Sequence, residues 1–336
     1  MQTKRLRWGV LGTAHIADKV VHGINLSANG VLTAIASRDP GMARDWASER
    51  NVPHSFGSYD DLLASDAIDA VYIPLPNGLH KEWTIKALQQ GKHVLCEKPL
   101  AANADEVREI IATADATGLK AMEAFMYRFH PAVARLQQLL TDGAIGDLKV
   151  IRASFGFRLI RPADIRWSAG MAGGALMDVG SYCVNNARMV GGEPRAVNAS
   201  SVFSSGGVDI NTVGILEFPN GVLAAIDCSF ETGPGAHQGL VISGTDGRIY
   251  VANPFSRDEN DPVHIVVNDA HDSERQGAAY TIEVPAADHY HLMVEHFAEA
   301  VLNDRPVAYT LQNSLCNMLV LDALKEAART GQRITM

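Results

Sequence analysis

The sequence predicts an α/β protein with two domains: a doubly wound parallel sheet first, then a domain with a large, mostly antiparallel open sheet. Over roughly the first 125 residues, short apolar runs alternate with helical patterns, which is typical of a parallel sheet wound with helices. After Pro131, apolar runs follow one another closely, with the hairpin signals Asn220-Gly221 and Asp246-Gly247 between them. A chain of 336 residues is also long for one hydrophobic core. We therefore expect domains at residues 1–124 and 125–336.

In the first domain, apolar runs predict five strands: Leu6–Leu11, Val31–Ala36, Ala70–Ile73, His93–Cys96 and Lys120–Ala124. Helical patterns lie between them: Ile16–Leu26, Met42–Glu49, Lys81–Gln89 and Ala104–Ala116. Asn103 is expected to cap the last helix, because Glu106 follows three residues later and the two side chains can satisfy free N–H groups at a helix start.

The second domain is predicted to open with a helix over Ala132–Leu140 and a strand over Leu148–Phe157. Five further strands are expected: Val197–Phe203, Val213–Phe218, Val222–Phe230, Leu240–Ser243 and Arg248–Val251. Two helical patterns close the chain: His289–Leu302 and Leu311–Thr330.

Composition excludes several classes of partner. The formal net charge of −9 argues against a surface for nucleic acid or anionic membranes. No apolar run reaches the length of about 18 residues that a membrane helix needs. The first strand starts directly after Lys4 and Arg5, which leaves no room for a signal peptide. The four cysteines are scattered without CxxC spacing, so we expect reduced thiols and a cytoplasmic protein.

A glycine-containing turn, Gly9–Ala17, lies where the first strand passes into the first helix. Glycine allows the tight turn, the small Ala17 allows close helix–strand packing, and the helix start offers free N–H groups to a diphosphate. An alanine replaces the middle glycine of the strict pattern, and a plain strand–helix turn is the alternative. The residues expected to bind the dinucleotide are Gly12, Thr13, Ala14, His15 and Ile16.

The end of the second strand indicates which dinucleotide binds. An NAD site usually has an acid here for the ribose 2′-hydroxyl, whereas Ser37 and Arg38 offer a hydroxyl and a guanidinium that suit a 2′-phosphate. NADP is therefore favoured, with NAD as the alternative. Asp39 could pair with Arg38, or Arg38 could be a solvated surface charge.

The loop after the third predicted strand is stiffened by two prolines and reaches the carboxyl edge of the sheet. Pro74, Leu75, Asn77 and His80 are expected to contact the cofactor there. Structural roles, as a turn residue for Asn77 and a helix N-cap for His80, are equally compatible with the sequence.

Lys98 follows the strand His93–Cys96, so it is expected to reach the ligand crevice, where its ammonium can hold a substrate hydroxyl. Further along, Asp178 and Tyr182 are four residues apart after Gly173-Gly174 and would share one helical face. A tyrosine near a lysine ammonium can act as an acid/base, whereas an ordinary helix start is the alternative.

The domain junction is aromatic and basic, and Tyr127 and Arg128 are candidates for binding a sugar-sized substrate, with interdomain packing as the alternative. His291 and Glu295 share a helical face without an evident third ligand, so no metal site is expected.

In order along the chain, the Gly9–Ala17 turn, Pro76-Asn77-x-x-His80, Glu97-Lys98-Pro99 and Gly173-Gly174…Asp178…Tyr182 resemble the glucose–fructose oxidoreductase / inositol dehydrogenase / rhizopine-catabolism (Gfo/Idh/MocA) family. The resemblance covers essentially the whole chain. It implies a Rossmann domain and a second domain whose open sheet mediates homodimers or homotetramers. Some members have a histidine where this chain has Tyr182, so the chain is most similar to the branch with dimeric dihydrodiol dehydrogenase and NADP-dependent xylose dehydrogenase.

The resemblance also implies residue roles. Lys98 would orient and polarise the substrate oxygen, Tyr182 would be the acid/base, and Asp178 would position the substrate or Lys98. The same resemblance implies that three further residues approach the cofactor: Glu97, Arg166 and Trp167.

We therefore expect an NADP(H)-dependent oxidoreductase acting on a CH–OH or C=O group of a sugar, polyol or cyclic diol. The alternatives are a ketoreductase for keto-sugars or nucleotide sugars, and a non-catalytic regulator that senses NADP.

Overall fold

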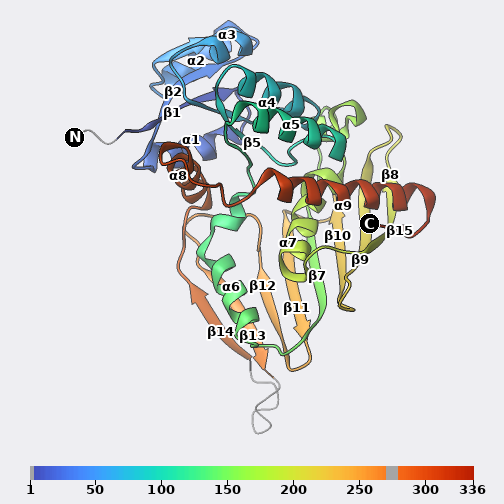
Figure 1. The fold of residues 1–336 in the computed structure, drawn as a ribbon. Coiled ribbons are helices and arrows are strands. Elements are labelled where there is room, and N and C mark those ends of the chain that lie inside the picture. The colour runs from blue at the N-terminus through green and yellow to red at the C-terminus, as the bar shows by residue number, and fades with distance from the viewer. Residues whose placement is uncertain (1–3, 270–278) are drawn as a thin grey trace. The chain divides into compact units, whose positions relative to one another are not determined.

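The computed structural model describes residues 4–269 and 279–336, which divide into two compact units (Figure 1). The first unit contains Met1–Met126 together with His289–Leu315, and the second contains Tyr127–Asp288 together with Cys316–Met336. The chain thus returns to the first unit after it has formed most of the second. The expected division at residue 124 placed this returning segment in the second domain. No described helix has both the length and the apolar character needed to cross a bilayer.

The first unit is built on a six-stranded parallel sheet in the order β3-β2-β1-β4-β5-β6. Its strands are β1 (Leu6–Leu11), β2 (Gly30–Ala36), β3 (His54–Phe56), β4 (Ala70–Ile73), β5 (His93–Cys96) and β6 (Ala121–Glu123). The predicted doubly wound sheet is confirmed. Because the strand order reverses between β1 and β4, a crevice for ligands is expected outside the carboxyl ends of these strands.

Helices alternate with these strands along the chain. They are α1 (Ala17–Leu26), α2 (Pro40–Glu49), α3 (Tyr59–Ala64), α4 (His80–Gln89), α5 (Ala104–Thr117) and, from the returning segment, α8 (His289–Leu302). Asn103 caps α5 as predicted, because its side chain accepts a hydrogen bond from the N–H of Glu106. Figure 1 shows α8 beside α1, where a Cβ on Gly23 would lie 2.8 Å from the backbone nitrogen of His291.

The second unit is built on a nine-stranded sheet in the order β14-β13-β12-β11-β7-β10-β9-β8-β15. All neighbours are antiparallel except β7 and β10, so the predicted mostly antiparallel sheet is confirmed. Its strands are β7 (Leu148–Gly156), β8 (Ala196–Phe203), β9 (Asp209–Glu217), β10 (Leu223–Ser229), β11 (His237–Gly244), β12 (Gly247–Ala252), β13 (Val263–Asp269), β14 (Ala279–Val284) and β15 (Ile334–Thr335).

Helices cover one face of this sheet. They are α6 (Pro131–Thr141), the π-helix η5 (Leu176–Gly180), α7 (Ser181–Gly191) and the second-unit part of α9 (Leu311–Thr330). The elements η5 and α7 pack on β7 and β10, and α6 packs on β13 and β14 (Figure 1). On β9, Gly214 and Leu216 are buried on this face, whereas Val213 and Ile215 are exposed on the other.

The sequence prediction missed several elements of the second unit. β13 and β14 were not expected, and β9 starts four residues before the predicted Val213. The glycine-rich segment before α7 was expected to enter a regular helix but forms a π-helix instead. The contacts by which Asp209 holds the start of this π-helix are described below.

Candidate active site

The glycine turn after β1 has the shape that a close-approaching ligand requires. Gly12 adopts φ +97°, and a Cβ there would lie 3.2 Å from the Leu75 side chain and 3.4 Å from the Tyr59 hydroxyl. Residues 13–16 then lead into α1. Asp18, in the first turn of α1, accepts hydrogen bonds from the Arg50 guanidinium, whereas the side chain of His15 is fully exposed.

The end of β2 separates the roles of three neighbouring residues. The Asp39 carboxylate accepts hydrogen bonds from the N–H groups of Gly41 (2.8 Å) and Met42 (3.1 Å), so it caps α2. Ser37 is buried and its hydroxyl accepts from the N–H of Asp39. Arg38 is exposed at the same strand end. The Asp39 carboxylate therefore binds the start of its own helix. The other two side chains at this strand end are the Ser37 hydroxyl and the Arg38 guanidinium.

The loop after β4 is tied to the loop after β5 by His80. This residue begins α4 and is fully buried, with Nδ1 2.7 Å from the carbonyl oxygen of Pro99 and Nε2 2.7 Å from that of Leu75. Burial lowers the pKa of His80 to about 4, and the charge of Lys98 lowers it further. The contacts with the two carbonyl oxygens act in the opposite direction, because they favour the protonated ring. Pro74 is buried, and Asn77 starts a short 3₁₀ turn (η1, Asn77–Leu79).

Two buried carboxylates fix the backbone on either side of Lys98. Glu97 accepts a hydrogen bond of 2.7 Å from the Tyr72 hydroxyl and one of 3.2 Å from the N–H of Lys98. Glu123, at the end of β6, accepts one from the N–H of Leu100 (2.9 Å). Burial, and next the charge of Glu97, raise the pKa of Tyr72, so that phenol stays protonated. Lys98 thus projects from a backbone held at the carboxyl edge of the sheet.

In the second unit, Asp209 holds the start of the π-helix that carries Asp178. Its carboxylate accepts hydrogen bonds from the N–H of Leu176 (2.7 Å) and from the Thr212 hydroxyl (2.9 Å). Gly174 lies so close, with φ +111°, that a Cβ there would be 2.1 Å from the Asp209 carboxylate. Burial raises the pKa of Asp209, while both hydrogen bonds favour its charged form. π-Helical turns are often found at functional sites.

Asp178 is buried and paired. Arg166, in the 3₁₀ turn η3 (Ile165–Trp167), donates from Nε to Asp178 at 2.7 Å and from Nη1 to Asp164 at 3.2 Å. The charge of Asp178 is the main reason that the pKa of Arg166 is raised. One guanidinium therefore serves two carboxylates, and the formal charge of the three groups is −1. Trp167 packs its ring on Phe230, with centroids 5.5 Å apart.

Tyr182 lies on the first turn of α7 within a cluster of aromatic rings. Its ring is 6.0 Å from that of Tyr127, 5.6 Å from that of Phe155 and 5.7 Å from that of Phe255, between centroids. The Tyr127 hydroxyl donates to the Asn185 amide oxygen at 2.5 Å, and Arg128 donates to the same oxygen at 3.3 Å. Burial raises the pKa of Tyr127. This cluster fixes the ring of Tyr182.

Three residues of these sites escaped the sequence prediction. Tyr59 approaches the glycine turn, Asp209 holds the π-helix, and Asp164 shares Arg166 with Asp178. None lies in a glycine-rich or strand-end motif, and Asp209 and Asp178 come from separate parts of the second unit. A single sequence carries no signal for such pairings.

A cavity of about 450 Å³ lies at the amino-terminal edge of the first sheet, away from these residues. It is lined by Arg7, Asp69 and Lys92, among others. Arg7 forms an ion pair with Asp69, and the Lys92 ammonium donates to the carbonyl oxygens of Ser65 and Ile68. The polar groups of this cavity already have partners within the fold, so the cavity is not a candidate catalytic site.

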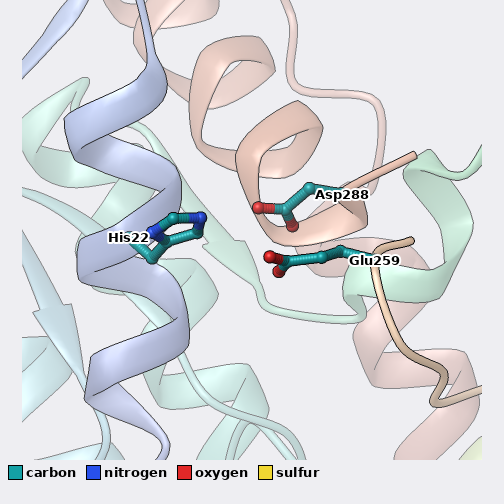
Figure 2. Close-up of side chains that lie close together, drawn as sticks. All are labelled: His22, Glu259 and Asp288. Atoms are coloured by element: carbon teal, nitrogen blue, oxygen red, sulfur yellow. The ribbon is translucent and has the colours of Figure 1, made fainter. Parts of the chain in front are cut away.

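The side chains that could suggest a metal do not form a ligand set within either unit. Figure 2 shows the side chains of Glu259 and Asp288, both of the second unit, lying side by side, and it also labels His22 from α1 of the first unit. His291 pairs with Glu295 along α8, with Nε2 and Oε1 3.3 Å apart. Among the described residues of the second unit, no third histidine, cysteine or carboxylate lies close to this pair, and two carboxylates are fewer ligands than a metal centre usually has, so we assign no metal to the pair.

Family models match most of the chain. The model of an oxidoreductase family with an NAD-binding Rossmann fold, GFO/IDH/MocA, matches residues 6–125. The model of a GFO/IDH/MocA C-terminal domain matches residues 133–250. The chain belongs to the GFO/IDH/MocA oxidoreductase family. The family predicted from the motifs is thereby confirmed.

Relatives within the family carry names of two related activities. A D-xylose 1-dehydrogenase (NADP(+)) of Haloferax volcanii is 38% identical over 333 residues, or 98% of this chain and 100% of the relative. A trans-1,2-dihydrobenzene-1,2-diol dehydrogenase of Mus musculus is 35% identical over 268 residues, or 78% of each chain. Both belong to the branch that the sequence motifs resemble.

Among solved structures, KijD10, a 3-ketoreductase from Actinomadura kijaniata in complex with NADP and TDP-benzene, matches with a TM-score of 0.90. It is 29% identical, and the match covers 96% of this chain and 98% of that one. The chain described here is an oxidoreductase of the same family.

Proposed function

We propose that this oxidoreductase transfers a hydride between NADP(H) and a CH–OH or C=O group of a sugar, polyol or cyclic diol, with Lys98 and Tyr182 as the acid/base pair. One observation carries the proposal: Lys98 leaves the carboxyl edge of β5 on a backbone fixed by two buried carboxylates, in the same sheet as the Gly12 turn. An ammonium in that position serves a substrate oxygen beside a dinucleotide. The names of the relatives support the same class of reaction.

The residues of the first unit fit NADP. A side chain at Gly12 would fill the turn over which a diphosphate passes, and the positive end of the α1 dipole suits its charge. Asp39, the residue available to bind a ribose 2′-hydroxyl, is occupied as the cap of α2. Ser37 and Arg38 would hold the 2′-phosphate. The residues that we assign to the rest of the NADP molecule are Thr13, Ala14, His15, Ile16, Pro74, Leu75, Asn77, His80, Glu97, Arg166 and Trp167.

When bound, the nicotinamide supplies the hydride acceptor or donor. The residues of the chain manage the substrate oxygen and its proton. Tyr182 Oη would take the carbinol proton during oxidation and return it during reduction, while the Lys98 ammonium donates to the same oxygen and stabilises its developing negative charge. Asp178, held by Arg166, would accept a hydrogen bond from a neighbouring substrate hydroxyl, and Tyr127 and Arg128 would line the substrate.

The charge around Asp178 favours a neutral polyhydroxyl substrate. Arg166 forms an ion pair with Asp178, and its charge is shared between Asp178 and Asp164. Arg166, Asp178 and Asp164 together therefore offer carboxylate acceptors to substrate hydroxyls. They offer no surplus positive charge to a phosphate.

A ketoreductase for keto-sugars, including nucleotide-activated ones, is a second candidate. It is supported by the likeness to KijD10, whose structure holds NADP and TDP-benzene. The two candidates differ in the substrate, which in the second case is a keto-sugar and carries a diphosphate where it is nucleotide-activated.

The experiment is a spectrophotometric assay at the reduced-nicotinamide band with NADP⁺ or NAD⁺ and a panel of aldoses, inositols and dihydrodiols. A signal with NADP⁺ and one class of substrate is expected. Lys98→Ala and Tyr182→Phe should each lower turnover by about 10²–10⁴-fold, while NADPH still binds as measured by fluorescence.

Three other outcomes would contradict the proposal in different ways. Loss of NADPH binding in both variants would show that these residues are structural. Turnover with a nucleotide keto-sugar but with no free sugar would favour the ketoreductase. Tight NADPH binding without turnover on either panel would favour a regulator that senses NADP.

We further propose that two or four copies associate through the open face of the nine-stranded sheet. A cross-strand row on that face runs from Ile215 through Ala225, Arg152 and Val241 to Tyr250. Ile215 is 48% and Tyr250 42% exposed, so the row is largely apolar and accessible. Contiguous exposed apolar surface of this kind usually marks an interface. A cytoplasmic location remains a prediction from the cysteine pattern; none of the four cysteines, all of which the structure describes, forms a disulfide.

A further inference from the structure

Tyr59 directs its hydroxyl to the corner where β1 and β2 end. It is the first residue of α3, directly after the N-cap Ser58, and only 7% of it is exposed. Its ring meets the Trp83 ring edge-on, with centroids 4.9 Å apart and an interplanar angle of 86°. The hydroxyl lies 3.4 Å from the position that a Cβ on Gly12 would take. The packing of the ring thus fixes a polar group over the glycine turn.

Arg38, two residues after the end of β2, is near enough for its charge to act on the same hydroxyl. Burial raises the pKa of Tyr59, and the charge of Arg38 and its polar contact with the hydroxyl act against that rise. A guanidinium has donors only, so the phenol oxygen is the acceptor in this contact. The hydroxyl proton of Tyr59 is then left to be donated to an anion beside Arg38. Asp39, the neighbouring acid, has its carboxylate on the N–H groups of α2.

We propose that Tyr59 is a specificity-determining residue, which orients Arg38 and donates its own hydroxyl hydrogen bond to the 2′-phosphate of NADP(H). The inference rests on the proposed NADP dependence. A dianionic phosphate would receive one charge-assisted hydrogen bond from the phenol and others from Arg38. The 2′-hydroxyl of NAD(H) carries no charge at this place, so the Tyr59 hydroxyl should contribute little to NADH binding.

The test is Tyr59→Phe, which removes the hydroxyl and keeps the ring against Trp83. Dissociation constants for NADPH and NADH are measured by fluorescence titration of the purified protein. We expect the NADPH constant to rise by about tenfold, as for the loss of one hydrogen bond to a charged group, and the NADH constant to change by less than about twofold. Tyr280→Phe, at a position of the second unit that is 45% exposed, controls for removal of a phenol hydroxyl as such.

A double-mutant cycle with Arg38→Ala tests whether the two residues act together. If Tyr59 works through Arg38 and the shared phosphate, Tyr59→Phe should weaken NADPH binding far less in the Arg38→Ala protein than in the wild type. Equal weakening of NADPH and NADH by Tyr59→Phe would overturn the inference in favour of a packing role. So would an unchanged NADPH constant. A wild-type protein that binds NADH as tightly as NADPH would instead refute the NADP assignment itself, and the inference with it.

Discussion

Arg166 is the residue whose partners say most about substrate binding in the second unit. Its two hydrogen-bonded carboxylates, Asp178 and Asp164, are held at 2.7 and 3.2 Å. The sequence predicted Asp178 and Arg166 separately, one for the substrate and one for the cofactor. The structure joins them by a hydrogen bond, so we expect Arg166 to act on the substrate through the orientation that it gives Asp178.

Arg166→Gln should therefore raise KM for the sugar or diol and lower kcat/KM by about 10–100-fold, because charge-assisted hydrogen bonds to Asp178 are lost. Steady-state kinetics with saturating NADP⁺ measure both parameters. Arg161→Gln is a matched control on the same exposed segment, since only the backbone carbonyl of Arg161 is used, by Trp167 Nε1. An unchanged KM in Arg166→Gln, or the same change in the control, would contradict this role.

At the level of elements, prediction succeeded where a pattern is local. The strands Leu6–Leu11, Ala70–Ile73 and His93–Cys96 and the helix His289–Leu302 have the predicted bounds, because each is a single apolar or amphipathic run. The π-helix could not be predicted, since it depends on the Asp209 carboxylate, which is some thirty residues away in sequence. The short β3 lacks a strong pattern of its own and is stabilised by pairing with β2. By contrast, β13 begins with the run Val263–Val267, which is rich in β-branched residues, a strand signal that the prediction overlooked.

The start of α6 makes a pH-dependent contribution that can be measured. The Nδ1 atom of His130 accepts a hydrogen bond from the N–H of Ala132 at 3.0 Å, which requires an unprotonated nitrogen. Burial, aided by the charge of Arg257, lowers the pKa of His130 from 6.5 to about 4. Between these values the unfolded chain binds more protons than the folded one, so stability is complete above pH 6.5 and declines as the pH falls toward 4.

His130→Asn should reduce this decline, because asparagine is a good N-cap that does not titrate. The melting temperature, recorded from pH 7 to pH 4 by circular dichroism, should fall less steeply than in the wild type. The buried His80 and the half-buried His93 and His296 also have lowered pKa values, so part of the decline should persist. His54→Asn, at an exposed site, is the control and should follow the wild-type curve. Parallel curves for His130→Asn and the wild type would exclude the cap as the cause.

At the scale of the whole molecule, the spacing of apolar runs predicted the fold class. It did not predict which helices and strands belong to which unit. Helix α8 belongs to the first unit because Glu295 accepts from the N–H of Ala28 and its carbonyl accepts from the Asn29 amide, contacts across more than 260 residues of sequence. The pattern of α8 shows that it has an apolar face, but not which sheet or helix covers that face.

The exposed face of the nine-stranded sheet leads to the last prediction. If copies of the chain associate there, Ile215→Lys should place a charge in an apolar interface and weaken the association by at least about 100-fold, since a buried ammonium without a partner costs several kcal/mol. Sedimentation velocity across a concentration series measures the change. Leu26→Lys is the control: Leu26 is 54% exposed on α1 of the first unit, and its replacement should leave the mass unchanged. A wild-type protein that sediments as a monomer at all concentrations would refute the interface. An oligomer that Ile215→Lys does not weaken would show that its copies meet elsewhere.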